Sequence, residues 1–442
     1  MSRASYWGTS FLMLLAVLGA TTAGLGATYL ARDGSALPES IELKAGVVYG
    51  ATLLAVWLSL RLGRFNGDPY LLPIAGMLGG IGLIMTVRLQ PDLAATRGLT
   101  IDVGERQLLY LVAGLILIWA IALLAPNPEI LAPYRYSVLS AGLALLALTA
   151  VAGTEINGAR LWISAGPVVI QSTEVVKLAL IVFLAAYLSQ NLELVGSSWR
   201  LGRLRVPPLP YLAPMVVMCG LSTAALMILN DLGTGLLFFM VFMMMLYAAN
   251  GRASQFFLGV ALFMGAFALA YFAVPRVRLR FDVWIDPWGD LVSGYQQIQA
   301  EYALATGGFF GVGLGKGSPW LVPVVENDYI IAAIGEETGF FGIVAVIAMY
   351  MLLATRGMVI ARSAPTSFLR LLAVGLTTGI VVQSVIILAG VLRLMPLTGV
   401  TLPLIAYGGS SILVTSVMIG ALMKISAFEP GNGAHRRSKA ES

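Results

Sequence analysis

Residues 232–250 read LGTGLLFFMVFMMMLYAAN, a run of 19 residues without one charged side chain. An α-helix needs about 20 such residues to cross the ~30 Å hydrocarbon core of a bilayer. Eleven further apolar stretches lie on both sides of this run, so the sequence predicts an all-α polytopic membrane protein of about twelve transmembrane helices. The candidate spans cover 10–30, 45–62, 70–88, 107–125, 136–153, 173–189, 209–229, 232–250, 254–274, 328–354, 369–391 and 402–424.

The composition of the whole chain supports this prediction. Of the 442 residues, 58% are apolar and 11% are charged, and the mean hydropathy is +0.87. A soluble domain has roughly 25% charged residues, and a soluble core of this size cannot bury so much apolar surface. A soluble enzyme is therefore excluded. An outer-membrane barrel is disfavoured because its strands alternate apolar and polar residues.

Two rare residues limit the chemistry that this chain can perform. Cys219 is the single cysteine and lies in an apolar run, so there is neither a disulfide framework nor a cysteine metal cluster. His435 is the single histidine and lies in the polar C-terminal stretch, which excludes catalysis by a buried histidine. Any catalysis must therefore use carboxylates, lysines, arginines or hydroxyls.

The charge distribution predicts the orientation in the membrane. With both termini in the cytoplasm, the cytoplasmic segments hold fifteen Lys and Arg against five Asp and Glu. This excess follows the positive-inside rule, and it accounts for the sequence pI of about 9.3 without nucleic-acid binding. The longest loop, 275–327, then lies outside the cytoplasm, and its aromatic and apolar stretches predict an ordered structure. Residues 428–442 are predicted to be a disordered cytoplasmic tail.

Several charged residues lie in or beside predicted spans, where ionisable groups are costly and are candidates for function. Glu174 and Lys177 are three residues apart and share one helix face. They form either a structural ion pair or a polar patch that faces a central cavity. Arg160 and Trp162, in the stretch that starts at Asn157, either anchor the chain at the membrane interface or bind a phosphate group.

Two further motifs favour a structural interpretation when they are taken alone. Asp231 directly precedes a span, and an aspartate at that place favours a helix N-cap. Residues 311–317 are rich in glycine, contain Lys316 and could cradle a phosphate. They match neither the Walker A pattern nor the dinucleotide fingerprint, so a flexible turn is favoured.

The junction of the long loop with the next span carries the strongest candidate. Asp328 lies at the outer membrane boundary, where partial desolvation of a carboxylate suits a general base near neutral pH. Its alternative role is again an N-cap. Glu336 and Glu337 follow inside the span, so one or both must face a polar cavity or an arginine. The stretch 396–411 breaks a helix at membrane depth, which is tolerated only inside protein or along a cavity.

Together these motifs resemble the SEDS family of bacterial cell-wall proteins, which includes RodA, FtsW and SpoVE. They occur in the order of the family over roughly 70–425. The matching segments are 157–162, 172–177, 231–234, 286–299, 327–329, 335–339 and 401–411. The family has about ten spans, so the resemblance implies a glycosyltransferase core at 69–427. Two additional transmembrane helices at 1–68 precede it, which favours a RodA-like member.

The resemblance implies a peptidoglycan glycosyltransferase that polymerises lipid II into glycan strands outside the cytoplasmic membrane, for cell elongation or division. Undecaprenyl pyrophosphate is released, and Asp328 matches the essential aspartate of the family, the proposed general base. The implied substrate-binding residues are Arg160, Trp162, Glu174, Lys177, Lys316, Tyr407, Ser410 and Ser411. The implied supporting polar residues are Asn157, Asp231, Gln296, Glu336 and Glu337.

The resemblance also implies partners and leaves a cofactor open. The partners are lipid II, the nascent glycan strand, a class B penicillin-binding protein and other elongation or division proteins. A divalent cation, Mg²⁺ or Mn²⁺, is an option near the pyrophosphate, without named ligands. Val324 and Glu326 stand where the family commonly has a glutamate and a histidine. These departures weaken the assignments in this loop but leave Asp328 in place.

Two other classes of function remain open. A lipid II flippase needs polar residues along the whole depth of its path, whereas the inner halves of these spans are mostly apolar. An inactive scaffold has no need of the polar motif residues, and they are all present. The sequence therefore favours the enzyme, with the flippase as the alternative.

Overall fold

The structure is a computed structural model, and it divides the chain into two compact units. Unit 1 comprises Met1–Leu124, Asp282–Arg356 and Gln383–Met423, and unit 2 comprises Ala125–Phe281, Gly357–Val382 and Lys424–Ser442. The described residues are 3–33, 41–97, 102–156, 159–165, 168–191, 199–201, 204–206 and 231–428, with single positions between 213 and 224. The additional helices predicted at 1–68 share unit 1 with later parts of the chain. The predicted tail after 428 lies outside the described residues.

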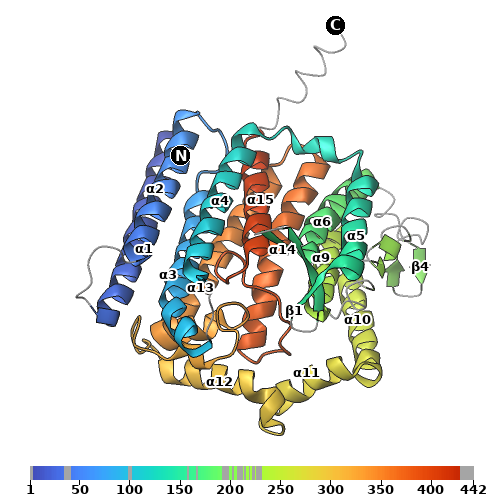
Figure 1. The fold of residues 1–442 in the computed structure, drawn as a ribbon. Helices are drawn as coiled ribbons and strands as arrows, with labels where there is room; N and C mark the ends of the chain where they lie inside the picture. Colours follow the sequence, from blue (N-terminus) through green and yellow to red (C-terminus); the bar gives the residue numbers. More distant parts are fainter. Residues whose placement is uncertain are drawn as a thin grey trace. The chain divides into compact units, whose positions relative to one another are not determined.

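Helices dominate the described chain (Figure 1). They are α1 (Arg3–Asp33), α2 (Ile41–Leu62), α3 (Leu71–Arg97), α4 (Val103–Leu124), η1 (Pro128–Leu131), α5 (Arg135–Ala152), α6 (Ser172–Gln190), α9 (Leu232–Asn250), α10 (Ala253–Ala273), α11 (Pro275–Ile285), α12 (Leu291–Gly307), η2 (Pro319–Leu321), α13 (Ile330–Ser363), α14 (Ser367–Val391) and α15 (Gly409–Ser426). Among the described residues, ten helices are long and apolar enough to cross a membrane: α1 to α6, α9 and α13 to α15. The prediction of a polytopic α-helical membrane protein is confirmed.

Most predicted spans agree with these helices within a few residues, and α9 has the predicted bounds. The span predicted at 254–274 corresponds to α10, whereas the span predicted at 209–229 lies largely outside the described residues. The span predicted from residue 402 begins later, at Gly409. Leu404 accounts for the difference, because its φ of 67° is left-handed and a right-handed helix cannot continue through it.

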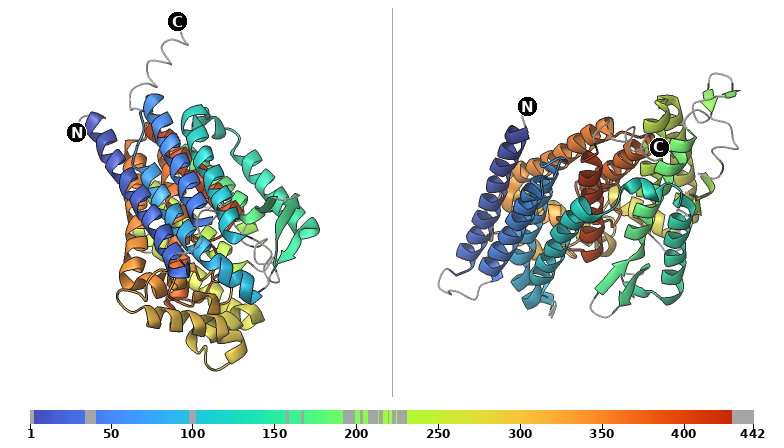
Figure 2. Two further views of the ribbon diagram at one scale, coloured as in Figure 1. Left: turned by 60° about the vertical axis from the view of Figure 1, so that its left-hand side comes forward. Right: turned by 90° about the horizontal axis from the view of Figure 1, so that it is seen from above.

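In unit 1 the first four helices lie side by side, blue to cyan in the two views of Figure 2. Small residues on α3 let the neighbouring helices approach closely. The Tyr49 hydroxyl of α2 donates to the carbonyl oxygen of Gly76 at 2.6 Å. A Cβ on Gly80 would stand 2.5 Å from the hydroxyl oxygen of Thr21 on α1. Small residues of this kind are typical where membrane helices pack together.

Unit 2 contains two small antiparallel sheets that the all-α prediction did not include. The first joins β1 (Thr154–Ile156), β2 (Ala159–Ala165) and β3 (Val168–Gln171), and the second joins β4 (Trp199–Leu201) and β5 (Leu204–Val206). Trp162 of β2 stands opposite Gln171 of β3. The β-branched and aromatic residues of β2 and β3 favour strands. The Asn-Gly dipeptide at 157–158 lies outside the described residues, but in sequence it is a strong hairpin signal that the prediction did not use.

The long loop predicted at 275–327 is ordered, as expected, and contains α11, α12 and η2. Asp290 caps α12, because its carboxylate accepts hydrogen bonds from the backbone N–H groups of Val292 at 3.0 Å and Ser293 at 3.4 Å. Hydrogen bonds from Ser293 and Val292 hold the pKa of Asp290 below its usual value. Capping by Asp290 thus explains why α12 begins directly after the stretch Asp286-Pro287-Trp288-Gly289.

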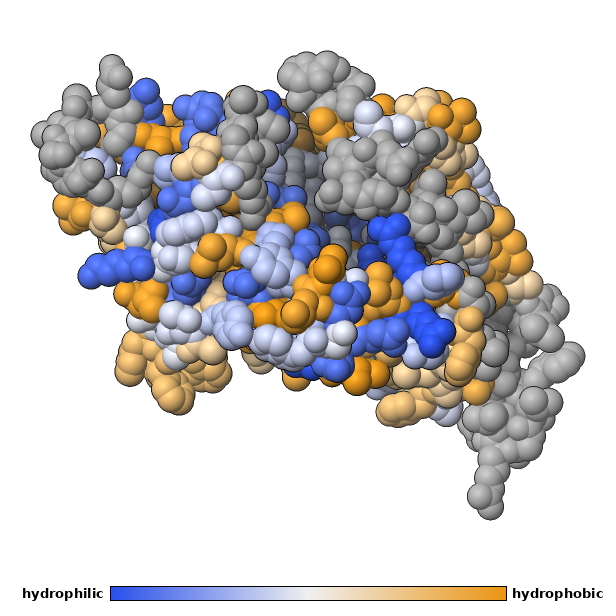
Figure 3. All heavy atoms as spheres, turned by 60° about the horizontal axis from the view of Figure 1, so that its bottom comes forward, coloured by the Kyte–Doolittle hydropathy of each residue, from blue (hydrophilic) through white to orange (hydrophobic). Residues whose placement is uncertain are grey.

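The face of unit 1 that carries α12 shows hydrophilic and hydrophobic residues next to one another (Figure 3). Exposed aromatic rings on α12 and just after it include Tyr295, Tyr302 and Phe309. Aromatic residues of this kind gather at the boundary between a membrane and water. This face therefore has the composition of a membrane–water interface.

Candidate active site

Asp328 lies in the turn that joins η2 to α13, two residues before that helix begins. Its side chain is half-buried, and the neighbouring Tyr329 is buried. Val324, earlier in the same turn, has a φ of 55°, in the left-handed region that a β-branched residue rarely adopts. Backbone strain of this kind persists only where surrounding contacts hold it, and it gathers at functional sites. The turn thus presents a carboxyl group from a firmly held backbone.

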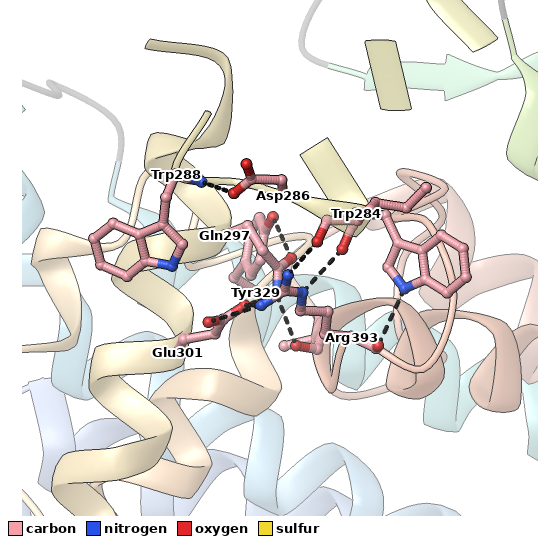
Figure 4. A network of polar contacts seen from close by, with 9 residues as sticks. Trp284, Asp286, Trp288, Gln297, Glu301, Tyr329 and Arg393 are labelled. Atoms are coloured by element: carbon pink, nitrogen blue, oxygen red, sulfur yellow. Dashed lines mark hydrogen bonds and ion pairs between the residues drawn. The ribbon is translucent and has the colours of Figure 1, made fainter. Parts of the chain in front are cut away.

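Tyr329 connects this turn to α12 (Figure 4). Its hydroxyl donates to the side-chain oxygen of Gln297 at 3.4 Å. The amide nitrogen of Gln297 donates in turn to Glu301 and to the carbonyl oxygen of Val391, both at 3.4 Å. Burial raises the pKa of Tyr329, and the charges of Asp328 and Glu301 add to the effect. The phenol therefore keeps its proton and acts as a donor.

Arg393 completes the same network (Figure 4). Its guanidinium donates to the carbonyl oxygens of Trp284 at 2.9 Å and Ile285 at 2.8 Å, and to Glu301 at 3.2 Å. The indole N–H of Trp284 donates back to the carbonyl oxygen of Arg393 at 3.1 Å. One side chain thus joins the last turn of α11, the middle of α12 and the end of α14.

The backbone of Arg393 is also unusual. The N–H of Leu394 donates to the carbonyl oxygen of Ala389 at 2.8 Å, and the N–H of Arg393 donates to that of Gly390 at 3.1 Å. These two bonds form a Schellman motif, which ends a helix with one left-handed residue, usually glycine. Here that residue is Arg393, with a φ of 58°. The left-handed conformation costs an L-residue about 1–2 kcal/mol.

A second structured region lies where α13 is interrupted at Gly339, whose φ is 72°. The glycine-rich stretch 307–317 satisfies the backbone groups that the break frees. The N–H groups of Val312 and Gly313 donate to the carbonyl oxygens of Glu336 and Glu337, each at 3.0 Å. A Cβ on Gly339 would stand 2.4 Å from the backbone nitrogen of Gly311. The interpretation of 311–317 as a flexible turn is therefore wrong, because this loop is bonded into the helix break.

The two adjacent glutamates of α13 are both bound. Glu337 accepts hydrogen bonds from the Arg88 guanidinium of α3 at 2.9 Å and from the N–H of Gly315 at 3.0 Å. Glu336 accepts from the N–H of Ser318 at 2.7 Å. Arg88 also pairs with Asp92 and lies 5.5 Å from the ring centre of Trp320. The prediction left a polar cavity or an arginine as the partner of one or both glutamates, and Glu337 has the arginine, Arg88.

The broken stretch between α14 and α15 also meets the Asp328 turn. The N–H of Tyr407 donates to the carbonyl oxygen of Glu326 at 2.8 Å, and burial raises the pKa of Tyr407. Leu404 has a φ of 67°, so this segment is strained too. Among the described residues, the buried hydroxyl of Ser411 has no hydrogen-bond partner. A buried polar group of this kind is suited to bind water or a ligand.

Three of the predicted site residues in unit 2, Glu174, Lys177 and Asp231, have defined partners within that unit. Lys177 donates to Glu174 at 2.5 Å, and both side chains are buried in α6. Asp231 caps α9, accepting from the N–H of Thr234 at 3.0 Å and from its hydroxyl at 2.6 Å. The N-cap interpretation of Asp231 is therefore confirmed. The ion pair is present as well, whereas its place in one cavity with Asp328 of unit 1 stays a prediction.

The remaining predicted residues differ in exposure. Trp162, Tyr407 and Ser410 are half-buried, and Lys316 is exposed. Asn157 and the side chain of Arg160 lie outside the described residues. Gln296 was predicted as a supporting residue, but it is exposed on α12, and the buried amide of the network belongs to Gln297. Neighbouring side chains on a helix point in directions about 100° apart. The sequence does not show which of two adjacent glutamines faces the interior, so the wrong one was predicted.

The sequence analysis missed the residues that hold the Asp328 turn. They are Gln297, Glu301 and Arg393, and Arg88 was missed as the residue that binds Glu337 beside the break in α13. One signal was available, because an arginine inside an apolar span, as Arg88 is, marks a buried partner. Arg393 lies just beyond a span, where an arginine reads as an interfacial anchor.

The described residues contain no group of three His, Cys, Asp or Glu side chains that could hold a metal ion. Mg²⁺ is commonly held by one or two carboxylates together with substrate phosphates, so the divalent cation stays a prediction.

Comparison with known proteins places these features in a family. The family model of FtsW, RodA and SpoVE, described as cell cycle protein, matches residues 69–430. The peptidoglycan glycosyltransferase RodA of Mycobacterium leprae is 35% identical over 383 residues, which cover 86% of this chain and 82% of the relative. Stage V sporulation protein E of Bacillus subtilis is 35% identical over 290 residues, which cover 64% of this chain and 76% of the relative.

Solved structures agree. The rod shape determining protein RodA of Thermus thermophilus has a TM-score of 0.57 at 27% identity, covering 81% of this chain and 96% of that one. A peptidoglycan synthase complex, described as coordinating polymerization and crosslinking, contains a chain with a TM-score of 0.66 at 26% identity. The match covers 81% of this chain and 97% of that chain. The protein therefore belongs to the FtsW, RodA and SpoVE family, the SEDS family that its motifs resemble.

Proposed function

We propose that this chain is a peptidoglycan glycosyltransferase that polymerises lipid II, with Asp328 as its general base. The RodA and FtsW relatives carry the name of that activity. The observation that carries the proposal is the place of Asp328, a half-buried carboxyl group in a strained turn at the end of a membrane-spanning helix. Such a group is held in one position and partly desolvated, as a general base requires.

The reaction follows from this chemistry. The carboxylate of Asp328 accepts the proton of the acceptor sugar hydroxyl while the hydroxyl oxygen attacks the anomeric carbon of the donor. The bond from that carbon to the pyrophosphate oxygen breaks, and undecaprenyl pyrophosphate leaves. Arg160, Lys177 and Lys316 are proposed to stabilise the negative charge of the leaving group. Trp162, Glu174, Tyr407, Ser410 and Ser411 are proposed to contact the substrate.

Purified protein with lipid II tests the proposal. Asp328→Asn keeps the shape of the side chain but cannot accept a proton, so glycan strand formation is expected to fall by about 100-fold or more. Asp102→Asn is the matched control, because Asp102 is an exposed carboxylate of the same unit. Equal activity of wild type and Asp328→Asn would reject Asp328 as the base. Strand formation by neither, even with a transpeptidase present, would favour lipid II transport.

The orientation and the partner belong to the same proposal. Both termini are placed in the cytoplasm and the active site outside it, so a cysteine at Lys316 should react with a membrane-impermeant maleimide in intact cells. A cysteine at Arg370 should not react. The partner is a class B penicillin-binding protein, a proposal supported by the similar chain in a peptidoglycan synthase complex. Co-purification with such a transpeptidase tests it.

A further inference from the structure

The end of α14 holds an arginine where the backbone favours a glycine. Arg393 occupies the left-handed position of a Schellman motif, with a φ of 58°. A glycine would fit this position without strain. What an arginine adds over a glycine at this position is its side chain, whose contacts are specific.

The side chain of Arg393 binds the open end of another helix. The carbonyl groups of Trp284 and Ile285 belong to the last turn of α11, where carbonyls lack partners within their own helix. The guanidinium donates to both, at 2.9 and 2.8 Å. A positive charge is also favourable at a helix C-terminus. Arg393 thus caps α11 from a distance of more than 100 residues in sequence.

The same guanidinium reaches the Asp328 turn through two side chains. Arg393 donates to Glu301, Glu301 accepts from Gln297, and Gln297 accepts from Tyr329, the residue next to Asp328 (Figure 4). Gln297 and Tyr329 are buried, so this part of the chain of contacts is shielded from water. A shift of Arg393 would pass through α12 to the backbone that carries the carboxylate.

We infer that Arg393 is a positioning residue, which fixes α11 and α12 against the end of α14 and so sets the position of Asp328. The inference rests on the proposed role of Asp328 in glycosyl transfer. It assigns a role in the reaction to a residue that touches neither the substrate nor the reacting atoms.

The first test uses a matched pair of glycine substitutions. Arg64 ends α2 in the same motif, with a φ of 53°, and the N–H of Phe65 donates to the carbonyl oxygen of Leu60 at 3.0 Å. Its side chain is exposed. Arg393→Gly and Arg64→Gly therefore make the same backbone change at two helix ends, and only the first removes the proposed network.

In lipid II polymerisation, Arg393→Gly is expected to lower kcat by about tenfold or more with KM changed less than about twofold, because small displacements of a catalytic group cost rate rather than binding. Arg64→Gly should match the wild type. Arg393→Lys keeps the charge without the planar fork, so its rate should lie between the two. Wild-type kcat in Arg393→Gly, in an assay where Asp328→Asn is inactive, would overturn the inference while leaving the proposed function intact.

Hydrogen–deuterium exchange provides a measurement that does not depend on activity. Backbone amides of 291–303 and 324–332 should exchange faster in Arg393→Gly than in Arg64→Gly, with thermal unfolding midpoints no lower than that of the wild type. Equal exchange in the two variants would overturn the positioning role even if the wild type forms no polymer. Faster exchange with no polymer from the wild type would support the positioning role and reject only the proposed function.

Discussion

Two arginine-centred networks in unit 1 differ in burial. Arg88 and Glu337 have side chains that are 3% and 0% exposed, whereas Arg393 and Glu301 are 32% and 30% exposed. A buried ion pair is costly to break, because the remaining charge has no partner and no water. A pair that water reaches contributes little to stability. The buried network therefore secures the fold around the break in α13, and the half-buried Arg393 network contributes mainly geometry near Asp328.

The two networks also join different parts of the unit. Arg88 fastens α3 to α13 and to the glycine-rich stretch, through Glu337 and the carbonyl oxygen of Gly317 at 3.0 Å. Arg393 fastens α11 and α12 to the end of α14. The Arg88 contacts lie on both sides of the segment from η2 to the start of α13, and the Arg393 network reaches that segment at Tyr329. The difference in burial predicts how each network responds to mutation.

The largest effect on stability is expected from Arg88→Met. The substitution leaves the buried carboxylate of Glu337 without its cation, which costs about 3–5 kcal/mol. A much lower midpoint of thermal unfolding in detergent, followed by intrinsic fluorescence, should show this loss. Adding Glu337→Gln to Arg88→Met removes the uncompensated charge and should recover part of the midpoint. An unchanged midpoint in Arg88→Met would mean that the buried pair does not secure the fold.

A somewhat smaller loss is expected when the glycine-rich stretch is pushed away from the helix break. In Gly339→Ala the added Cβ would stand 2.4 Å from a backbone nitrogen at a φ of 72°. The unfolding free energy should fall by about 2 kcal/mol. Gly19→Ala in α1 is the control, because no atom lies within 4 Å of its added Cβ, and it should cause no loss. Equal midpoints for both variants would contradict the close packing at Gly339.

The smallest effect is expected from Arg393→Met. Water can replace the guanidinium at Glu301 and at the exposed carbonyl groups, so the loss of unfolding free energy should be at most about 1 kcal/mol. The same thermal assay measures it beside Arg88→Met. A loss as large as that of Arg88→Met would erase the contrast between the two networks and assign Arg393 a role in stability.

The sequence predicted local features well. The spans follow from runs of apolar residues, and the cap at Asp231 follows from one residue before a helix. The need of Glu336 or Glu337 for an arginine or a polar cavity follows from the cost of a charge inside a membrane. Each of these three features depends only on a short stretch of chain and on whether water or lipid surrounds it. Both small sheets of unit 2 were missed, and for the first the single signal at 157–158 competed with the expectation of helices.

Tertiary structure alone decided which distant residues meet. The place of Arg88 in an apolar span indicates that it needs a partner. It does not identify that partner as Glu337, 249 residues away. The choice of Gln297 over Gln296 depends on how α12 is turned, and the role of Arg393 depends on where α14 ends. Each span must satisfy the requirements of the bilayer by itself, so each one is recognisable as an apolar run in the sequence. Contacts between spans depend on packing of the whole unit, which no short stretch of sequence contains.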